Sequence, residues 1–384
     1  MAALSAITGL GLSPLSRNDI GTSRDLAIEA VVNAVDDAGL SLRDIDGLLL
    51  AKSPSASLDS LPLHLRDDLA LPPLKLLCQV EGEGTSVAQT IQYATFAIRH
   101  GMATRIVCVF ADARIGGQAS GKGYAKPMDV SGLGSWDADH GLLGAIGPYA
   151  LQARRYMDRF GLTEQALGAY AIACRRWAVL NPLSFARTEL TMDAYLASRQ
   201  IVSPLRLLDC AFPINGAAAV VVEAAGRCTD RVCVYVHGIG QGHAGDTGMP
   251  TADLALGARM AADACLGMAG IDRKDVAQVQ MYDPFSSVGL QLLEAYGFCD
   301  GGEAGELVRS GATSPGGRLP VNTGGGHLSG FYLQGMTPVV EAVMQLRGQA
   351  GARQCTRGPT LVGALGGCMQ YHAALLLSHE ETLA

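Results

Sequence analysis

Apolar positions in the first part of the chain switch between helical spacing and short continuous runs. Residues 23–38 carry apolar side chains along one helix face, Gly39 is typical of a helix end, and the run GLLLA at 47–51 has the composition of a buried strand. A second pair, a helix followed by a strand that begins RIVCVFA, occupies 86–111. This alternation of helices with apolar strands predicts an α/β protein.

The same order of elements returns about 230 residues later. A helix within 253–285 ends at an Ala-Gly pair, and aligning AGLSLRDIDGLLL with AGIDRKDVAQVQM places Asp44 opposite Asp275. The helix and strand of 86–111 are echoed by a helix at 335–348 and the strand TLVGALGG. Two copies of one βαβ-rich unit predict a pseudo-symmetric fold with mixed or parallel sheets. Chance similarity between amphipathic helices is the alternative, because Ala-Gly followed by an apolar residue is a common helix ending.

The repeat divides the chain into an N-terminal half, 1–225, and a C-terminal half, 226–384. Between the repeated units lies a polar stretch rich in Arg and Gly, at about 113–205. A long stretch of this kind is typical of a functional insertion. We therefore expect it to cover the substrate.

Composition narrows the possible classes of function. The chain has 384 residues, 48% of them apolar, and a net charge of -7 without any basic run, which argues against nucleic acid and membrane surfaces as partners. No stretch approaches the roughly 18 apolar residues of a membrane span. The N-terminus lacks a basic region and is more typical of a first strand than of an export signal. The ten cysteines show no CxxC or CxxxC pairing, so we expect reduced cysteines, no structural zinc and a cytoplasmic location.

Two segments resemble the sterol-carrier-protein branch of the thiolase superfamily. The first, within 161–222, carries Asn-Pro at 181–182, then PLRLLDC and NGAAAVV, with Asn215 where the family usually has aspartate. The second is the loop NTGGGHLSGFYLQG at 322–335, followed by the glycine-rich turn GALGGC. The resemblance covers essentially the whole chain. It implies a five-layered αβαβα fold built from two similar halves.

The resemblance also shows that the nucleophile position has changed. The family's cysteine stands in a context like V-E-x-x-C-A-S-G, and the matching run VEGEGTS at 80–86 places Gly84 at the cysteine position. A glycine cannot be acylated, so the covalent route has no obvious carrier. We expect the missing side chain to leave volume for a bulkier acyl group. Cys78 and Cys368 remain as alternative nucleophiles, although inert buried cysteine is the simpler interpretation.

Two tyrosines occupy the positions at which the family builds its oxyanion hole. Tyr282, in YDPF, aligns with the polar residue of the N-E-A-F-like motif, and Tyr332, in GFYL, aligns with the histidine of G-H-P. A phenol can donate a strong hydrogen bond to a thioester oxygen, and a phenolate can act as a base. The alternative is that both tyrosines only pack.

This pattern resembles the thiolase-like aldolases that shorten steroid side chains. The resemblance implies a β-hydroxyacyl-coenzyme A substrate with a tertiary hydroxyl on a ring carbon. Retro-aldol cleavage would release a ring ketone and a short acyl-coenzyme A such as propionyl-coenzyme A, with Tyr282 and Tyr332 as the acid and base. Coenzyme A is expected as part of the substrate. No lysine stands in a site motif and no residues cluster as metal ligands, so we expect no other cofactor and no metal.

Other residues of the same motifs are candidates for supporting roles. His327 could orient Tyr332 or contact the acyl group, although a loop histidine more often bonds nearby backbone. Asp283 could tune Tyr282 or cap a turn. Gly325 and Gly326, together with Gly84, are predicted to let the backbone approach the ligand closely.

The resemblance further implies partners. A homodimer is expected, together with a small partner subunit that carries a zinc ribbon and an oligonucleotide-binding-type (OB) fold. Two other functions remain open: a non-catalytic scaffold subunit that supports an active partner, and an acyl-coenzyme A thiolase or acyltransferase with an atypical nucleophile. The two tyrosines separate the aldolase from the scaffold.

Overall fold

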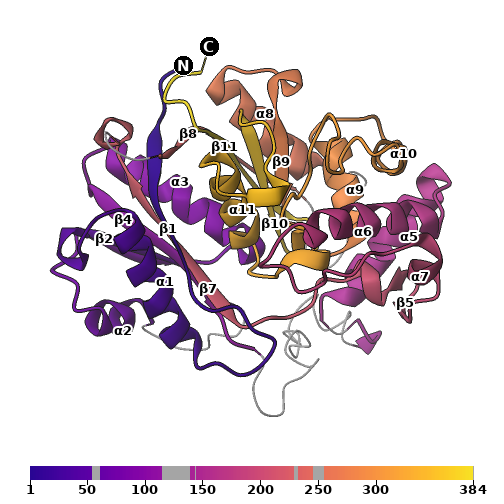
Figure 1. The fold of residues 1–384 in the computed structure, drawn as a ribbon, viewed down its shortest axis with the longest axis horizontal. Helices are drawn as coiled ribbons and strands as arrows, with labels where there is room; N and C mark the ends of the chain where they lie inside the picture. The colour runs from indigo at the N-terminus through magenta and orange to yellow at the C-terminus, as the bar shows by residue number, and fades with distance from the viewer. Residues whose placement is uncertain (54–60, 115–138, 143, 229–231, 245–254, 384) are drawn as a thin grey trace.

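The computed structural model describes residues 1–53, 61–114, 139–142, 144–228, 232–244 and 255–383. In these residues nine strands form one mixed sheet in the order β3–β2–β4–β7–β1–β8–β11–β10–β9 (Figure 1). The strands are β1 (Ser5–Leu12), β2 (Gly47–Ala51), β3 (Leu76–Val80), β4 (Arg105–Asp112), β7 (Gly216–Glu223), β8 (Val234–His243), β9 (Gln278–Met281), β10 (Thr360–Gly366) and β11 (Tyr371–Ser378). A separate hairpin pairs β5 (Gln200–Val202) with β6 (Leu205–Arg206).

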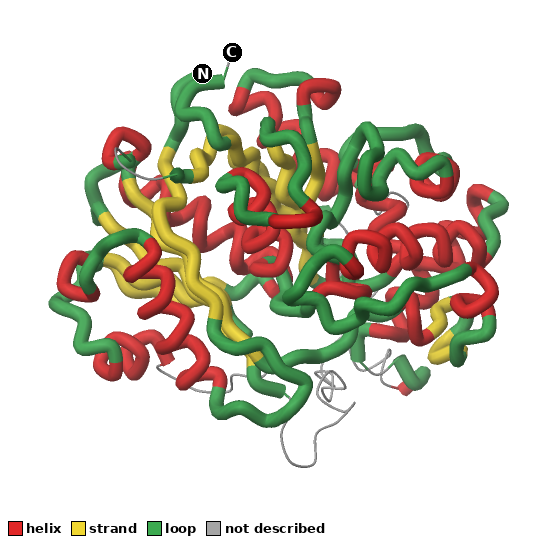
Figure 2. Tube along the Cα trace, in the orientation of Figure 1, coloured by secondary structure: helices red, strands yellow, loops and turns green. Residues whose placement is uncertain are grey.

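The helices form three layers around this sheet, as the red segments of Figure 2 show. Helices α1 (Ser23–Asp37) and α2 (Leu61–Asp68) cover one outer face, α3 (Ser86–Arg99) and α11 (Met336–Leu346) lie between the two halves of the sheet, and α8 (Leu256–Ala269) covers the other outer face. The halves join through a short antiparallel pairing of β1 with β8 at Ala6 and Tyr235. The five-layered arrangement expected from the sequence is confirmed.

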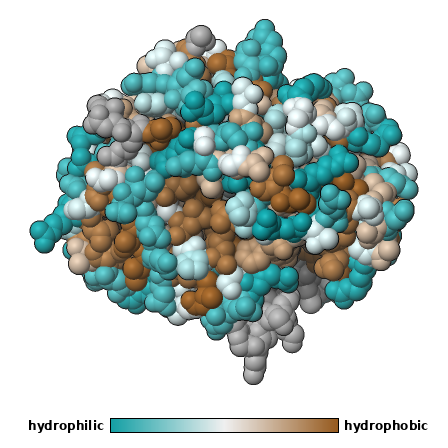
Figure 3. All heavy atoms as spheres, viewed as in Figure 1, coloured by the Kyte–Doolittle hydropathy of each residue, from teal (hydrophilic) through white to brown (hydrophobic). Residues whose placement is uncertain are grey.

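Burial on both faces explains why apolar and polar residues do not alternate along the strands. Every residue of β7, GAAAVVVE, and of β10, TLVGALG, is buried, because helices cover both faces of the sheet. One apolar cluster fills the space between the half-sheets, and two others lie under the outer helices. The outer surface in Figure 3 is mostly polar, with apolar residues gathered near the centre and lower left of that face.

The internal repeat corresponds to equivalent local structure. Helix α1 leads through a short 3-10 helix, η1 (Leu42–Asp44), into β2, and α8 leads through η5 (Arg273–Asp275) into β9. Asp44 accepts a hydrogen bond from the Ser41 backbone N–H at 2.9 Å, and Asp275 accepts one from the Asp272 backbone N–H at 3.3 Å. The aligned aspartates therefore make the same turn. Strands β1 to β7 come from 1–225 and β8 to β11 from 226–384, whereas the domain boundary itself stays a prediction.

The described part of the predicted insertion packs on the C-terminal half. It forms α5 (Ile146–Phe160), α6 (Glu164–Val179) and α7 (Met192–Leu196), and residues 115–138 lie outside the described ones. Helix α6 packs against α9 (Ser286–Ala295) and α10 (Ala304–Arg309). The insertion therefore stands beside the loops that follow β9.

The expectation that all cysteines are reduced is wrong at one pair. Cys228 and Cys233 form a disulfide in the connection between β7 and β8, with their Cα atoms 6.3 Å apart. The sequence separation of five falls outside the short spacings considered, so the pattern gave no signal. Within the described ranges, no helix is long and apolar enough to cross a membrane.

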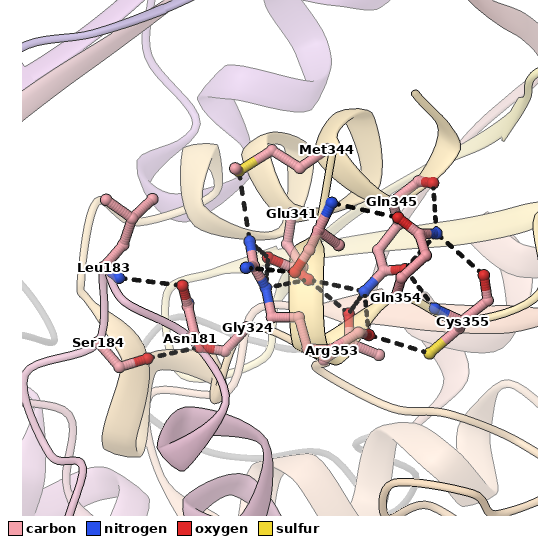
Figure 4. A network of polar contacts seen from close by, with 12 residues as sticks. Asn181, Leu183, Ser184, Gly324, Glu341, Met344, Gln345, Arg353, Gln354 and Cys355 are labelled. Atoms are coloured by element: carbon pink, nitrogen blue, oxygen red, sulfur yellow. Dashed lines mark hydrogen bonds and ion pairs between the residues drawn. The ribbon is translucent and has the colours of Figure 1, made fainter. Parts of the chain in front are cut away.

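A buried ion pair holds the glycine-rich loop against the central helices (Figure 4). Arg353 donates to both carboxylate oxygens of Glu341 on α11, at 3.0 to 3.1 Å, and both residues are buried. Glu341 also accepts from the Thr323 hydroxyl at 2.7 Å. On the other side of the loop, the Gly324 carbonyl accepts from Asn181 at 2.9 Å. The loop is thus fixed from both sides.

Replacing Glu341 by glutamine should destabilise the protein by about 3 kcal/mol, because Arg353 would keep a buried charge without its counter-charge. The free energy of unfolding in urea measures the loss. The matched control is Glu306→Gln, which breaks the exposed pair with Arg309 and should change stability little. Equal effects of the two substitutions would contradict a structural role for the buried pair.

Candidate active site

The two predicted tyrosines meet at the carboxyl end of β9. Tyr282 follows β9 directly, and its backbone N–H donates to the Gly363 carbonyl of β10 at 2.9 Å. Tyr332 follows the π-helical turn η6 (Gly326–Gly330). Their hydroxyl oxygens lie 2.6 Å apart, and both side chains are buried. The structure therefore joins residues fifty positions apart into one hydrogen-bonded pair of phenols.

His327 packs against both tyrosine rings, while its two ring nitrogens contact other groups. Its ring centroid is 4.7 Å from that of Tyr282 and 5.3 Å from that of Tyr332. Nδ1 lies 2.6 Å from Asp283 Oδ1, and Nε2–H donates to the Gln334 carbonyl oxygen at 2.8 Å. With both nitrogens engaged elsewhere, His327 contacts the two tyrosines through ring packing, and its role in orienting Tyr332 stays a prediction.

Asp283, next to Tyr282 in the chain, makes several hydrogen-bond contacts that connect segments around the two tyrosines. In addition to its close contact with His327 Nδ1, its carboxylate accepts from the His327 backbone N–H at 2.9 Å and from the Tyr170 hydroxyl at 3.0 Å. Asn322 in turn donates to the Tyr170 hydroxyl at 3.2 Å and accepts from the Met281 N–H at 2.7 Å. Burial, together with the Asp283 carboxylate, raises the pKa of Tyr170. These contacts tie the strand end that bears Tyr282 to the glycine-rich loop.

The space expected above Gly84 is occupied, so that prediction is wrong. A Cβ atom at Gly84 would lie 2.1 Å from the Leu365 carbonyl oxygen and 3.1 Å from Cζ of Tyr282. On the same segment, the Gly84 carbonyl oxygen would lie 2.4 Å from a Cβ at Gly335. Backbone from three parts of the chain therefore converges here. The position has no room for a cysteine side chain.

Protein atoms also fill the positions of side chains at the loop glycines. Gly325 and Gly326 have φ of 96° and 58°. A Cβ at Gly326 would lie 2.4 Å from Asp283 Oδ2, and one at Gly325 would lie 2.7 Å from the Ala178 Cβ. Tight packing within the protein therefore accounts for both glycines. Their approach to a ligand, like that of Gly84, stays a prediction.

Burial sets the protonation of Tyr332. Loss of solvent raises the pKa of Tyr332 to about 12, while hydrogen bonds from Tyr282 and from the Gln334 side chain oppose that rise. The neighbouring Asp112 carboxylate raises this pKa further, and Arg114 lowers it. Tyr332 is therefore a phenol at neutral pH, and its phenolate is a minor but strongly basic form.

Sequence reasoning missed a third tyrosine at the site. Tyr149 of α5 is buried against Phe285, with ring centroids 4.7 Å apart, and its hydroxyl donates to the Gly367 carbonyl at 2.5 Å. Burial raises the pKa of Tyr149, and the charges of Cys368, Glu83 and Tyr332 add to the shift. Tyr149 lies in the insertion without any motif, so only the fold could reveal it.

Two residues that carry the family resemblance make buried polar contacts with other segments of the chain. Asp209, from PLRLLDC, accepts from the Tyr195 hydroxyl at 2.8 Å and from the hydroxyl of Ser286, the first residue of α9. Asn215 and Ser16 pair through their backbones, and the Asn215 side chain donates to Asn18 at 3.0 Å. Among the described residues, no three His, Cys, Asp or Glu side chains are grouped to hold a metal ion.

Known proteins of similar sequence belong to the thiolase-type group that the sequence motifs resemble. Residues 240–379 fit the family model described as thiolase C-terminal domain-like. The chain is 33% identical to a steroid side-chain-cleaving aldolase of Thermomonospora curvata, covering 89% of this chain and 90% of the relative. It is also 33% identical to the 17-hydroxy-3-oxo-4-pregnene-20-carboxyl-CoA lyase of Mycobacterium tuberculosis, covering 91% and 92%.

Solved structures of two such proteins superpose on this chain over nearly its whole length. The Ltp2-ChsH2(DUF35) aldolase superposes with a TM-score of 0.87 at 30% identity, covering 99% of this chain and 98% of the other. Human mitochondrial 3-ketoacyl-CoA thiolase superposes with a TM-score of 0.71 at 15% identity, covering 98% of this chain and 100% of the other, which shows a shared fold.

The crowding at Gly84 predicts that restoring the family's cysteine fails. Gly84→Cys should lower the melting temperature and confer no thiolytic cleavage of a 3-ketoacyl-coenzyme A, because the new side chain overlaps the Leu365 carbonyl. Thermal unfolding and a thiolysis assay measure both effects. The matched control is Gly267→Cys on α8, where a Cβ meets nothing within 4 Å. A stable variant with thiolase activity would refute this account of position 84.

Proposed function

The chain belongs to the thiolase superfamily, and we propose that it is a carbon–carbon lyase that cleaves a β-hydroxyacyl-coenzyme A by a retro-aldol reaction. The observation that carries this proposal is the buried pair of phenols, 2.6 Å apart, beside a nucleophile position with no room for a side chain. The similarity to two relatives named as aldolase and lyase supports the same reaction class.

The proposed reaction balances without a cofactor. One tyrosine, as phenolate, takes the proton of the β-hydroxyl, and the bond between the α- and β-carbons breaks. The β-carbon becomes a ketone, and the electron pair of the broken bond forms a thioester enolate that a phenol can stabilise by hydrogen bonding. Protonation of the α-carbon then releases the acyl-coenzyme A. The short contact between the hydroxyls gives the proton a direct path from one tyrosine to the other.

The proposed substrate carries a tertiary hydroxyl on a ring carbon, as in a degraded steroid side chain. Cleavage at that carbon yields a ring ketone and a short acyl-coenzyme A such as propionyl-coenzyme A. The names of the relatives, one of which specifies a hydroxylated pregnene carboxyl-coenzyme A, support this substrate class. Coenzyme A is part of the substrate, and the mechanism calls for no other cofactor.

Replacing either tyrosine should remove most of the activity. Tyr282→Phe and Tyr332→Phe should each slow cleavage by about 100-fold or more, which is the usual loss of a general acid or base. Ring ketone and acyl-coenzyme A are measured by mass spectrometry, without added free coenzyme A and with a candidate partner subunit co-expressed. Tyr371→Phe, at a half-exposed tyrosine, is the matched control.

The outcomes separate the remaining functions. Unchanged rates in both tyrosine variants would sink the mechanism. No cleavage by the wild type would favour the non-catalytic scaffold. Cleavage that needs free coenzyme A and is blocked by thiol alkylation would favour a thiolase with an atypical nucleophile.

We also propose a cytoplasmic homodimer that works with a small zinc-ribbon and OB-type partner. The name of the structural relative, which joins Ltp2 to a DUF35 domain, supports a partner of this kind. In the described sheet β3 is an edge strand, paired with β2 alone, so its outer edge offers backbone hydrogen bonds to a second copy.

The homodimer predicts a particle of twice the 39.9 kDa chain mass in sedimentation equilibrium. Gln79→Arg, on the exposed side of β3, should shift it toward monomer because two like charges then face each other across the symmetric edge. Gln200→Arg, on the exposed hairpin strand β5, is the matched control. A monomeric wild type, or equal behaviour of both variants, would contradict this interface.

A further inference from the structure

The hydrogen bonds of His327 determine how many protons its ring carries. Nε2 lies 2.8 Å from the Gln334 carbonyl oxygen, which can only accept, so Nε2 bears a proton. Nδ1 lies 2.6 Å from Oδ1 of Asp283. A bare ring nitrogen and an ionised carboxylate are both acceptors, and two acceptors repel each other at this distance. One further proton therefore lies between His327 and Asp283.

The other contacts of Asp283 favour placing that proton on the ring. Oδ1 accepts from the His327 backbone N–H at 2.9 Å, and Oδ2 accepts from the Tyr170 hydroxyl at 3.0 Å. Donors of this kind stabilise an ionised carboxylate. The Asp283 backbone N–H approaches Nδ1 at 3.2 Å, which favours the opposite assignment, but this contact is longer than the other two. The ring is therefore an imidazolium paired with a carboxylate.

This ion pair has its positive end toward the phenols. Both of its side chains are fully buried. The carboxylate contacts Tyr170 and Cys174 of α6, whereas the imidazole ring packs in T-shaped geometry against Tyr282 and Tyr332, with centroids 4.7 and 5.3 Å apart. A cation within about 6 Å of an aromatic ring centroid is attracted to that ring.

We propose that Asp283 and His327 are positioning residues that hold a buried imidazolium beside Tyr282 and Tyr332 and so stabilise the phenolate on which cleavage depends. A phenolate carries more negative charge than a phenol, so the attraction grows as the base forms. Burial raises the pKa of Tyr332 to about 12, which makes its phenolate scarce at neutral pH. A fixed positive charge opposes that effect. This inference rests on the proposed retro-aldol function.

The other charged groups packed around the loop are engaged elsewhere. Arg175 of α6 donates to the Ser329 hydroxyl at 2.9 Å. Glu341 of α11 is paired with Arg353. Among the described residues, Asp283 is the only carboxylate within hydrogen-bond distance of the imidazole ring. The charge on the ring therefore depends on Asp283.

Nitrogen-15 nuclear magnetic resonance of the full chain, labelled at histidine, measures the proton directly, because the two protonation states of an imidazole give different nitrogen signals. The wild-type His327 signal, assigned by its loss in His327→Gln, should show both nitrogens protonated at neutral pH. In Asp283→Asn the same ring should carry a single proton. Asp209→Asn removes another buried aspartate and should leave the His327 signal unchanged.

Cleavage rates should follow the charge. Asp283→Asn should lower kcat about tenfold at neutral pH, as expected when the pKa of the tyrosine base rises by one unit, with little change in KM. The loss should shrink as the pH falls, because acid returns the missing proton to His327. His327→Gln should lose as much without this recovery, and the double variant should lose no more than either, because the two residues act as one unit. For Asp209→Asn, the ratio to the wild type should not change with pH.

A wild type that cleaves substrate while its His327 ring carries a single proton would overturn this inference and leave the proposed function intact. That measurement needs no folded Asp283 variant. A ratio of Asp283→Asn to wild type that stays constant across pH would have the same meaning. A wild type that cleaves nothing would overturn the proposed function and, with it, this role of the imidazolium.

Discussion

Three segments of backbone meet at Gly84 more closely than any side chain would allow, and the site is assembled around that contact. The Leu365 carbonyl stands where a Cβ of residue 84 would be, and Gly335 lies against the Gly84 carbonyl. This approach brings the start of α3, the end of β10 and the turn before α11 together. Tyr282 lies against the same point, and its hydroxyl is hydrogen-bonded to that of Tyr332.

Polar contacts hidden from water keep these segments in place. Glu341 and Arg353 hold the glycine-rich loop from the central helices, and Asp283 and His327 hold it from the end of β9. A buried polar group left without its partner is costly, so each pair resists rearrangement. The tyrosine rings are connected to these fixed segments because both rings pack against His327.

Burial also changes the acidity of Tyr332. Loss of solvent raises the pKa of Tyr332, so its phenolate, once formed, is a stronger base than in water. The contact with Tyr282 and the amide of Gln334 partly offset that cost. A site of this kind needs no acyl-enzyme, because the thioester itself accepts the electrons of the broken bond.

Local patterns along the sequence were enough to predict the helices, the strands and the repeat. The spacing of apolar residues depends directly on which faces of each helix or strand are buried. Motif resemblance also predicted that Tyr282, Tyr332 and His327 belong to one site, and the fold brings the three side chains together. The tertiary structure alone decided what surrounds them. The filled space above Gly84 and the position of Tyr149 against Gly367 depend on atoms from distant segments. Such contacts leave no trace in spacing or composition, because they form only when the two halves of the sheet pack together.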